Sequence, residues 1–169
     1  MVEWVSKTQR HVTRATFASE LYGGTDALDQ GKLLQASLHE LHSGPGSLDE
    51  LRQLTKRGEL QVALILVLDA MSVVAAIAAP TIKTPAESGL LVHLKWMREQ
   101  LDSNQLWCIC WADTRSMAAD GLTKGTLDRK ALHDILEGSW RLDQPLKVWR
   151  GPMAARSDSP NRSSRSSWD

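Results

Sequence analysis

An unbroken run of apolar residues, Val62–Leu68, is rich in branched side chains and predicts a strand that is buried on both faces of a sheet. The run is too short to cross a membrane. Asp69 follows it directly, and the carboxyl end of a central strand is where α/β sheets bind ligands. Asp69 is therefore a candidate site residue. The alternative is that Asp69 only caps the helix expected over Ala70–Ala79.

A second pattern, with apolar residues at helical spacing, predicts one long helix over Ala15–Leu41. Its apolar stripe consists of Phe17, Leu21, Leu28, Leu34, Leu38 and Leu41. Gly23, Gly24 and Gly31 oppose this prediction, because each costs about 1 kcal/mol against alanine inside a helix. Such glycines make sense if the helix lies close against the sheet. Glu20 stands at the margin of the stripe and is expected to point toward the sheet, the alternative being a surface acid.

The remaining pattern completes one α/β domain over residues 1–150. The expected elements are a strand at Val2–Val5, helices at Leu48–Arg57 and Ala86–Leu101, a strand at Leu106–Trp111, a helix at Leu127–Trp140 and an extended arm at Leu142–Trp149. Because helices separate the strands at 62–68 and 106–111, we expect these two to pair in parallel. Residues 151–169 are rich in Ser and Arg and predict a disordered tail.

Composition limits the classes of function that the chain can have but does not identify one. The chain has 20 basic and 20 acidic residues, so any contact with nucleic acid must be local. It shows neither a signal peptide nor a membrane-spanning run, which predicts a soluble intracellular protein of cytoplasm or nucleus that is not secreted. Cys108 and Cys110 share a strand face at a spacing that suits neither a zinc knuckle nor an easy disulfide, and they are interpreted as small buried side chains.

The stretch WADTRSMAADGLTK, residues 111–124, carries the most specific motif. Its matching residues are Ala119, Asp120, Leu122, Thr123 and Lys124. They resemble the C-terminal end of the RNase H domain in Ty1/copia-type retrotransposon (reverse transcriptase) polyproteins. Residues 4–20 and the strand that ends in Asp69 are similar to two earlier segments of that family, in the same order. The resemblance covers about residues 2–130.

The resemblance implies an RNase H-like mixed sheet with flanking helices. It also implies hydrolysis of the RNA strand of an RNA–DNA hybrid, with two divalent ions about 4 Å apart activating water and stabilising the leaving oxygen. Glu20, Asp69 and Asp120 resemble the family's second, third and fourth catalytic carboxylates, which bind the metal ions. Mg²⁺ or Mn²⁺ is the implied cofactor, since hard cations take oxygen ligands.

Hybrid recognition in such a fold relies on phosphate and 2′-hydroxyl contacts, with shape dominating over sequence. Lys7, Arg10, Arg14 and Lys83 are the candidate phosphate contacts. The alternative for these residues is a solvated basic turn.

One departure from the family pattern changes the expected activity. The family's first metal-bridging aspartate lies upstream of the strand that Val2–Val5 resembles, so we expect an N-terminally truncated domain whose first hairpin is missing. Such a fragment is inactive alone unless an upstream reverse transcriptase segment completes it. Two other readings stay open: a non-catalytic RNase H-like remnant that binds nucleic acid or protein, and an Asp-nucleophile phosphohydrolase. The phosphohydrolase reading requires a second aspartate at the position where this chain has Met71.

Overall fold

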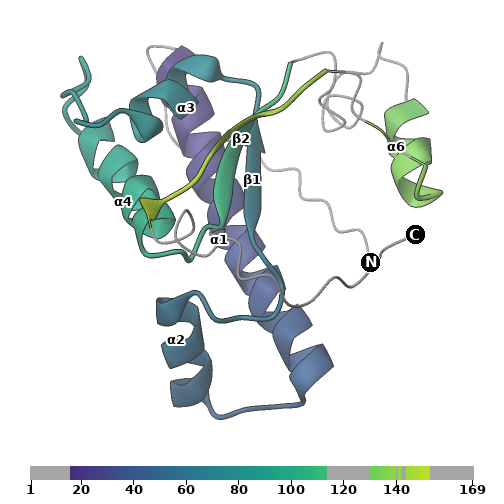
Figure 1. Ribbon diagram of the computed structural model, residues 1–169. Coiled ribbons are helices and arrows are strands. Elements are labelled where there is room, and N and C mark those ends of the chain that lie inside the picture. The colour runs from purple at the N-terminus through teal and green to yellow at the C-terminus, as the bar shows by residue number, and fades with distance from the viewer. Residues whose placement is uncertain (1–15, 114–129, 140, 142–143, 153–169) are drawn as a thin grey trace.

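The computed structural model describes residues 16–113, 130–139, 141 and 144–152, and within them the fold is mixed α/β (Figure 1). The elements are α1 (Thr16–Ser43), α2 (Leu48–Arg57), β1 (Ile65–Leu68), α3 (Met71–Ala78), α4 (Leu90–Asp102), β2 (Cys108–Trp111), α6 (Lys130–Leu136) and β3 (Lys147–Trp149). The prediction of an α/β chain is confirmed at this level. The predicted strand Val2–Val5, the segment of Asp120 and the tail beyond Pro152 lie outside the described residues.

The three strands form one mixed sheet in the order β1-β2-β3. β1 and β2 are parallel, with Ile65 opposite Cys108 and Leu68 opposite Trp111. The predicted parallel pair is therefore confirmed. β3 falls in the predicted extended arm and pairs with β2 in the antiparallel sense, with Val148 opposite Cys110.

β1 differs from its prediction in length and in burial. It begins at Ile65, three residues later than expected. Leu66 is buried, whereas Ile65 is 51% and Val67 38% exposed, so the strand is not buried on both faces. The reason is the period-2 alternation of side chains: α1, α3 and α4 pack on one face, and Ile65 and Val67 point to the other.

The core fills the space between the sheet and helices α1, α3 and α4. Its largest fully buried side chains are Leu21, Leu28, Val73, Val74, Ile77, Leu94, Met97, Leu106 and Ile109. α1 passes behind the strands in Figure 1. A Cβ at Gly24 would lie 3.5 Å from both methyl groups of Leu68, and one at Gly31 would lie 2.8 Å from a methyl of Leu64. These two glycines allow the close approach of helix to sheet that the sequence predicted.

The C-terminal half of α1 leaves this core and continues beside α2 (Figure 1). The predicted stripe fails there, because Leu41 is 70% exposed, while the polar Gln35 is buried and donates to the carbonyl oxygen of Val62 at 2.6 Å. The sheet no longer lies under the helix at Leu41, so periodicity alone does not bury this residue.

Two other predicted helices differ at their ends. α3 and α4 begin at Met71 and Leu90, one and four residues after the predicted starts. α2, by contrast, has the predicted bounds. No helix in the described part of the chain is long and apolar enough to span a membrane.

Candidate functional site

The parallel register brings the carboxyl ends of β1 and β2 to one edge of the sheet, here called the carboxyl edge (residues 69–70 and 112–113). The backbone N–H of Ala112 donates to the carbonyl oxygen of Leu68 at 3.0 Å, which extends the pairing past the last strand residue. The Trp111 indole Nε1 donates to the carbonyl oxygen of Asp69 at 2.8 Å. The residues after both strands are thus tied together at the edge where parallel α/β sheets commonly bind ligands.

Asp69 lies at this edge with its backbone fixed. Its carbonyl oxygen also accepts from the N–H of Met71 at 3.0 Å, as the chain turns into α3. The alternative role of Asp69 as the helix cap is wrong, because the N-cap residue is Ala70 and no side chain caps this helix. Among the described residues, the Asp69 carboxylate has no hydrogen-bond or ion-pair partner. It is half-buried and available for a ligand.

Glu20 comes to the same end of the sheet through the direction of α1. Gly24 contacts Leu68 at the end of β1, and Gly31 contacts Leu64 before its start, so α1 runs antiparallel to β1. Glu20 precedes Gly24 by four residues, which places it about 6 Å further along the same helix face, beyond Leu68. The side chain is half-buried, in agreement with its predicted position at the margin of the stripe.

Asp120, the third predicted carboxylate, lies outside the described residues. Asp113 is described and follows β2 at the carboxyl edge. In the described part of the chain, no three His, Cys, Asp or Glu side chains form a group that could hold a metal ion. Glu20 and Asp69 offer the hard oxygen donors that Mg²⁺ and Mn²⁺ prefer, but a site requires further ligands beyond this pair.

Lys147 is a cation at this edge that the sequence did not single out. It opens β3 opposite Trp111, and its Nζ lies 4.9 Å from the centroid of the Trp111 ring. A lysine on an aromatic face is a common element of nucleic-acid surfaces, where the ring stacks and the cation meets phosphate. No local signal marks Lys147, because its neighbour is 36 residues away and meets it only through strand pairing.

The predicted cationic contacts are only partly described. Lys83 lies in the segment between α3 and α4, is exposed, and forms no ion pair with another described residue. Lys7, Arg10 and Arg14 lie outside the described residues. Lys83 and Lys147 are thus the exposed lysines that bear on the hypothesis of a basic contact surface.

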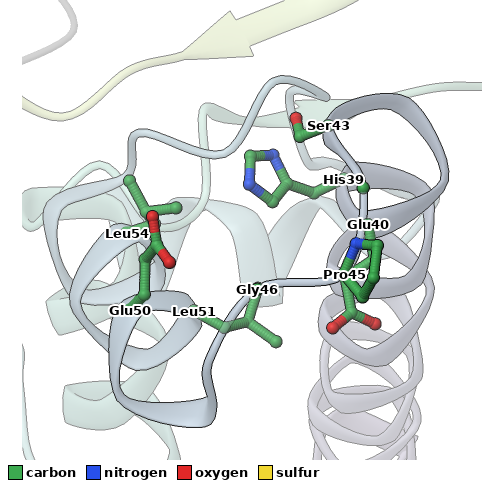
Figure 2. Close-up of a pocket in the computed structure, with 9 residues that line it drawn as sticks. His39, Glu40, Ser43, Pro45, Gly46, Glu50, Leu51 and Leu54 are labelled. Carbon is green, nitrogen blue, oxygen red and sulfur yellow. The ribbon is translucent and has the colours of Figure 1, made fainter.

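Two hollows that are lined by described residues lie away from this edge. One, of about 130 Å³, opens between the end of α1 and α2, and His39 and Glu50 project into it from the two helices (Figure 2). His39 Nδ1 accepts from the backbone N–H of Gln61 at 3.3 Å, so this ring has a structural partner. A second hollow, of about 170 Å³, lies beside Arg98 and Trp149. Neither is lined by Glu20 or Asp69.

The candidate site is therefore the carboxyl edge, with the carboxylates of Glu20 on α1 and Asp69 after β1, and with Lys147 on the Trp111 ring. Comparison of the chain with protein-family models, with curated proteins and with solved structures gives no match.

Proposed function

We propose that this chain is part of an RNase H-like domain of the Ty1/copia retrotransposon type, and that it binds RNA–DNA hybrid across the carboxyl edge. Glu20, Asp69 and Asp120 are the metal-binding carboxylates of this proposal. The observation that supports it best is the parallel register of Leu68 with Trp111, because it ends two neighbouring strands at the same edge. The antiparallel course of α1 then brings Glu20 to that end.

The described residues have distinct tasks in this proposal. The hydrogen bonds from Met71 and Trp111 to the Asp69 carbonyl oxygen hold the backbone in place, so the side chain that bears the carboxylate starts from a fixed position. Glu20 reaches the edge from a helix that is packed on the core, and Asp120 is assigned by resemblance alone. Bound Mg²⁺ or Mn²⁺ supplies an activated water and charge stabilisation for the leaving oxygen.

Lys147 and Trp111 extend the proposed surface to the nucleic acid backbone. The exposed Lys147 neutralises a phosphate, while the Trp111 ring limits the orientations that the lysine adopts. Lys83 serves as a second phosphate contact. Because the net charge of the chain is zero, these local cations carry the electrostatic part of binding.

Catalysis by residues 1–169 alone is expected to be very weak. The family resemblance assigns a further metal-bridging aspartate to a segment upstream of the matched residues. Loss of one strong electrostatic group in catalysis costs about a hundred- to a thousandfold in rate. We therefore expect residues 1–169 to cleave hybrid at least a hundredfold more slowly than the same chain extended by a strand that bears this aspartate.

A metal titration tests the proposal without requiring turnover. Mn²⁺ should raise the melting temperature of residues 1–169, because ions that bind only the folded state stabilise it by mass action. Asp69→Asn should abolish this shift. Asp49→Asn is the matched control, since Asp49 is exposed on α2 and its one ion-pair partner among the described residues is Arg52 at the surface.

A second arm addresses hybrid binding by fluorescence anisotropy. Lys147→Gln should weaken the affinity for RNA–DNA hybrids of any base sequence. It should also reduce the slope of the logarithm of the affinity against the logarithm of the salt concentration by about one unit. Lys56→Gln on α2 should leave both quantities unchanged. Unchanged binding in Lys147→Gln, together with an unchanged metal response in Asp69→Asn, would contradict the proposed edge.

A non-catalytic binding module is the second candidate. The observation that favours it is the exposure of branched side chains on one sheet face, with Ile65 at 51%, Val67 at 38% and Val148 at 47%. Exposed apolar patches commonly mark interaction surfaces. Hybrid binding that persists in Asp69→Asn, with no cleavage by the extended chain, would favour this function over the enzyme.

A further inference from the structure

The two cysteines of the chain form a pair that the proposed function does not use. Cys108 and Cys110 both lie on β2, two residues apart, so their side chains share one face of the central strand. Their Sγ atoms are 3.7 Å apart, within the range of a thiol–thiol hydrogen bond. Both are free, and both are buried, at 4% and 2% exposure.

The side chains opposite the two cysteines make this sheet face apolar. Ile65 and Val67 of β1 stand opposite Cys108 and Cys110 in the parallel register, and Val148 of β3 stands opposite Cys110. All three are exposed branched side chains, whereas the two cysteine side chains are buried. The thiols thus lie on a sheet face whose neighbouring apolar side chains are exposed.

The surroundings of Cys110 favour its protonated form. Burial, followed by the adjacent Cys108 thiol, raises the pKa of Cys110 from 9.0 to about 12, and the nearby positive charge of Arg150 offsets this only in part. The thiolate is the form that attacks alkylating reagents, so Cys110 is expected to react slowly with them at neutral pH. A ligand that binds the Cys110 sulfur at neutral pH must therefore displace the proton of the thiol.

The separation of the sulfurs fixes the kind of ligand that fits. If both Sγ atoms, which are 3.7 Å apart, bind one central atom through bonds of about 2.3 Å, the length of a zinc–thiolate bond, the angle between the two bonds at that atom is about 107°. This angle suits a tetrahedral or pyramidal centre and does not suit a linear one. A tetrahedral cation needs two more ligands, and the described residues provide no group of three or more metal-ligating side chains.

We propose that Cys108 and Cys110 form a dithiol site that chelates one trivalent arsenic centre. A monosubstituted arsenical has two positions for sulfur and a third occupied by its own organic group, so the two cysteines satisfy it completely. Soft sulfur ligands favour such a soft centre. The organic group lies among Ile65, Val67 and Val148 on the open side of the strand.

The binding step involves no oxidant or reductant. With phenylarsine oxide as the probe, the two S–H bonds and the arsenic–oxygen bond break while two As–S bonds form. The two protons leave with the oxygen as one water molecule, and arsenic stays trivalent. The product carries no charge, which suits an apolar face better than a bis-thiolate metal complex.

The test uses the reduced full chain and phenylarsine oxide. Native mass spectrometry should show one arsenical per chain, and the adduct should raise the melting temperature, because the folded strand presents both sulfurs at the chelating distance. Cys108→Ala and Cys110→Ala should each lower the affinity at least about a hundredfold, since the second thiol acts at high effective concentration. Excess 2,3-dimercaptopropanol should remove the adduct, whereas 2-mercaptoethanol should not.

Three results would overturn the proposal. The first is an adduct that forms only in denaturant or lowers the melting temperature, because the Cys-x-Cys segment then binds only when unfolded. The second is an unchanged affinity in either single variant, which means attachment through one sulfur. The third is recovery of a Cys108–Cys110 disulfide, with no adduct, from protein kept under reducing conditions. The wild-type melting shift decides the matter even if a variant fails to fold.

Discussion

The two halves of α1 share one helix but differ in what holds them. The first half lies against β1, α3 and α4 and contributes Leu21 and Leu28 to the core. The second half continues beside α2 and carries Leu33 and Leu41 at 65% and 70% exposure. A single helical period runs through both, so the difference arises from the sheet beneath the first half and not from the helix itself.

α2 sharpens this comparison. It has strong local helix signals: Ser47 accepts from the N–H of Glu50 at 3.2 Å, and Gly58 ends the helix in the left-handed conformation at φ 65°. It contains no buried residue. The first half of α1 lacks acidic residues in its first turn and includes two adjacent glycines, yet it anchors the core. Local helix signals and contribution to the core are therefore independent here.

Truncation of one leucine in each half should give the largest contrast. Leu28→Ala should lower the free energy of unfolding by about 2–5 kcal/mol, because it leaves a cavity under the sheet. Leu41→Ala should change it by no more than about 0.5 kcal/mol, since the side chain is exposed. Urea denaturation followed by circular dichroism measures both. Equal costs would mean that the second half of α1 is as well packed as the first.

Two arginines extend the comparison to polar contacts. Arg98 bonds both Asp102 carboxylate oxygens at 3.0 Å and the carbonyl oxygens of Ile77 and Ala79 at 2.8 Å, which ties the end of α3 to α4. Arg98→Met should cost about 1.5–3 kcal/mol, the range for hydrogen bonds to charged groups.

Arg52 is the control on α2. It pairs with Asp49 at 3.7 Å with both side chains largely exposed, so Arg52→Met should change the free energy of unfolding by at most about 0.5 kcal/mol. The same denaturation measurement serves both variants. A cost for Arg52→Met that approaches that of Arg98→Met would show that α2 is coupled to the core.

The smallest expected effect on global stability concerns the cap of α2. Ser47→Ala should weaken the helix by about 1 kcal/mol. Because α2 buries no residue, we expect amide exchange within α2 to become about fivefold faster while the melting temperature stays nearly constant. Hydrogen exchange resolved by residue measures the first quantity and calorimetry the second. A clear fall in melting temperature would place α2 within the cooperative unit.

For the fold, prediction succeeded where the signals are local. The bounds of α2 follow from the Ser47 cap and Gly58, which lie beside the helix in sequence. The parallel pair followed from helices between the strands. The prediction that β1 is buried on both faces was wrong, because an apolar run in the sequence does not determine whether helices cover one face of the sheet or both.

For the candidate site, the sequence singled out Asp69 at the end of a strand and Glu20 at the margin of a helical apolar stripe. The course of α1 along β1 directs both toward the same end of the sheet. The capping alternative for Asp69 is excluded by Ala70, which takes that place. Lys147 was missed because its contact with Trp111 depends on pairing across the sheet. The metal assignment, which includes Asp120, stays a prediction.

The sequence by itself determined the helices, the two parallel strands and the residues that end them, because backbone hydrogen bonding and side-chain period act over a few neighbours. Tertiary structure alone decided which face of β1 is covered, where α1 leaves the core, and that Lys147 meets Trp111. These features depend on contacts between distant segments, which no local pattern in the chain encodes.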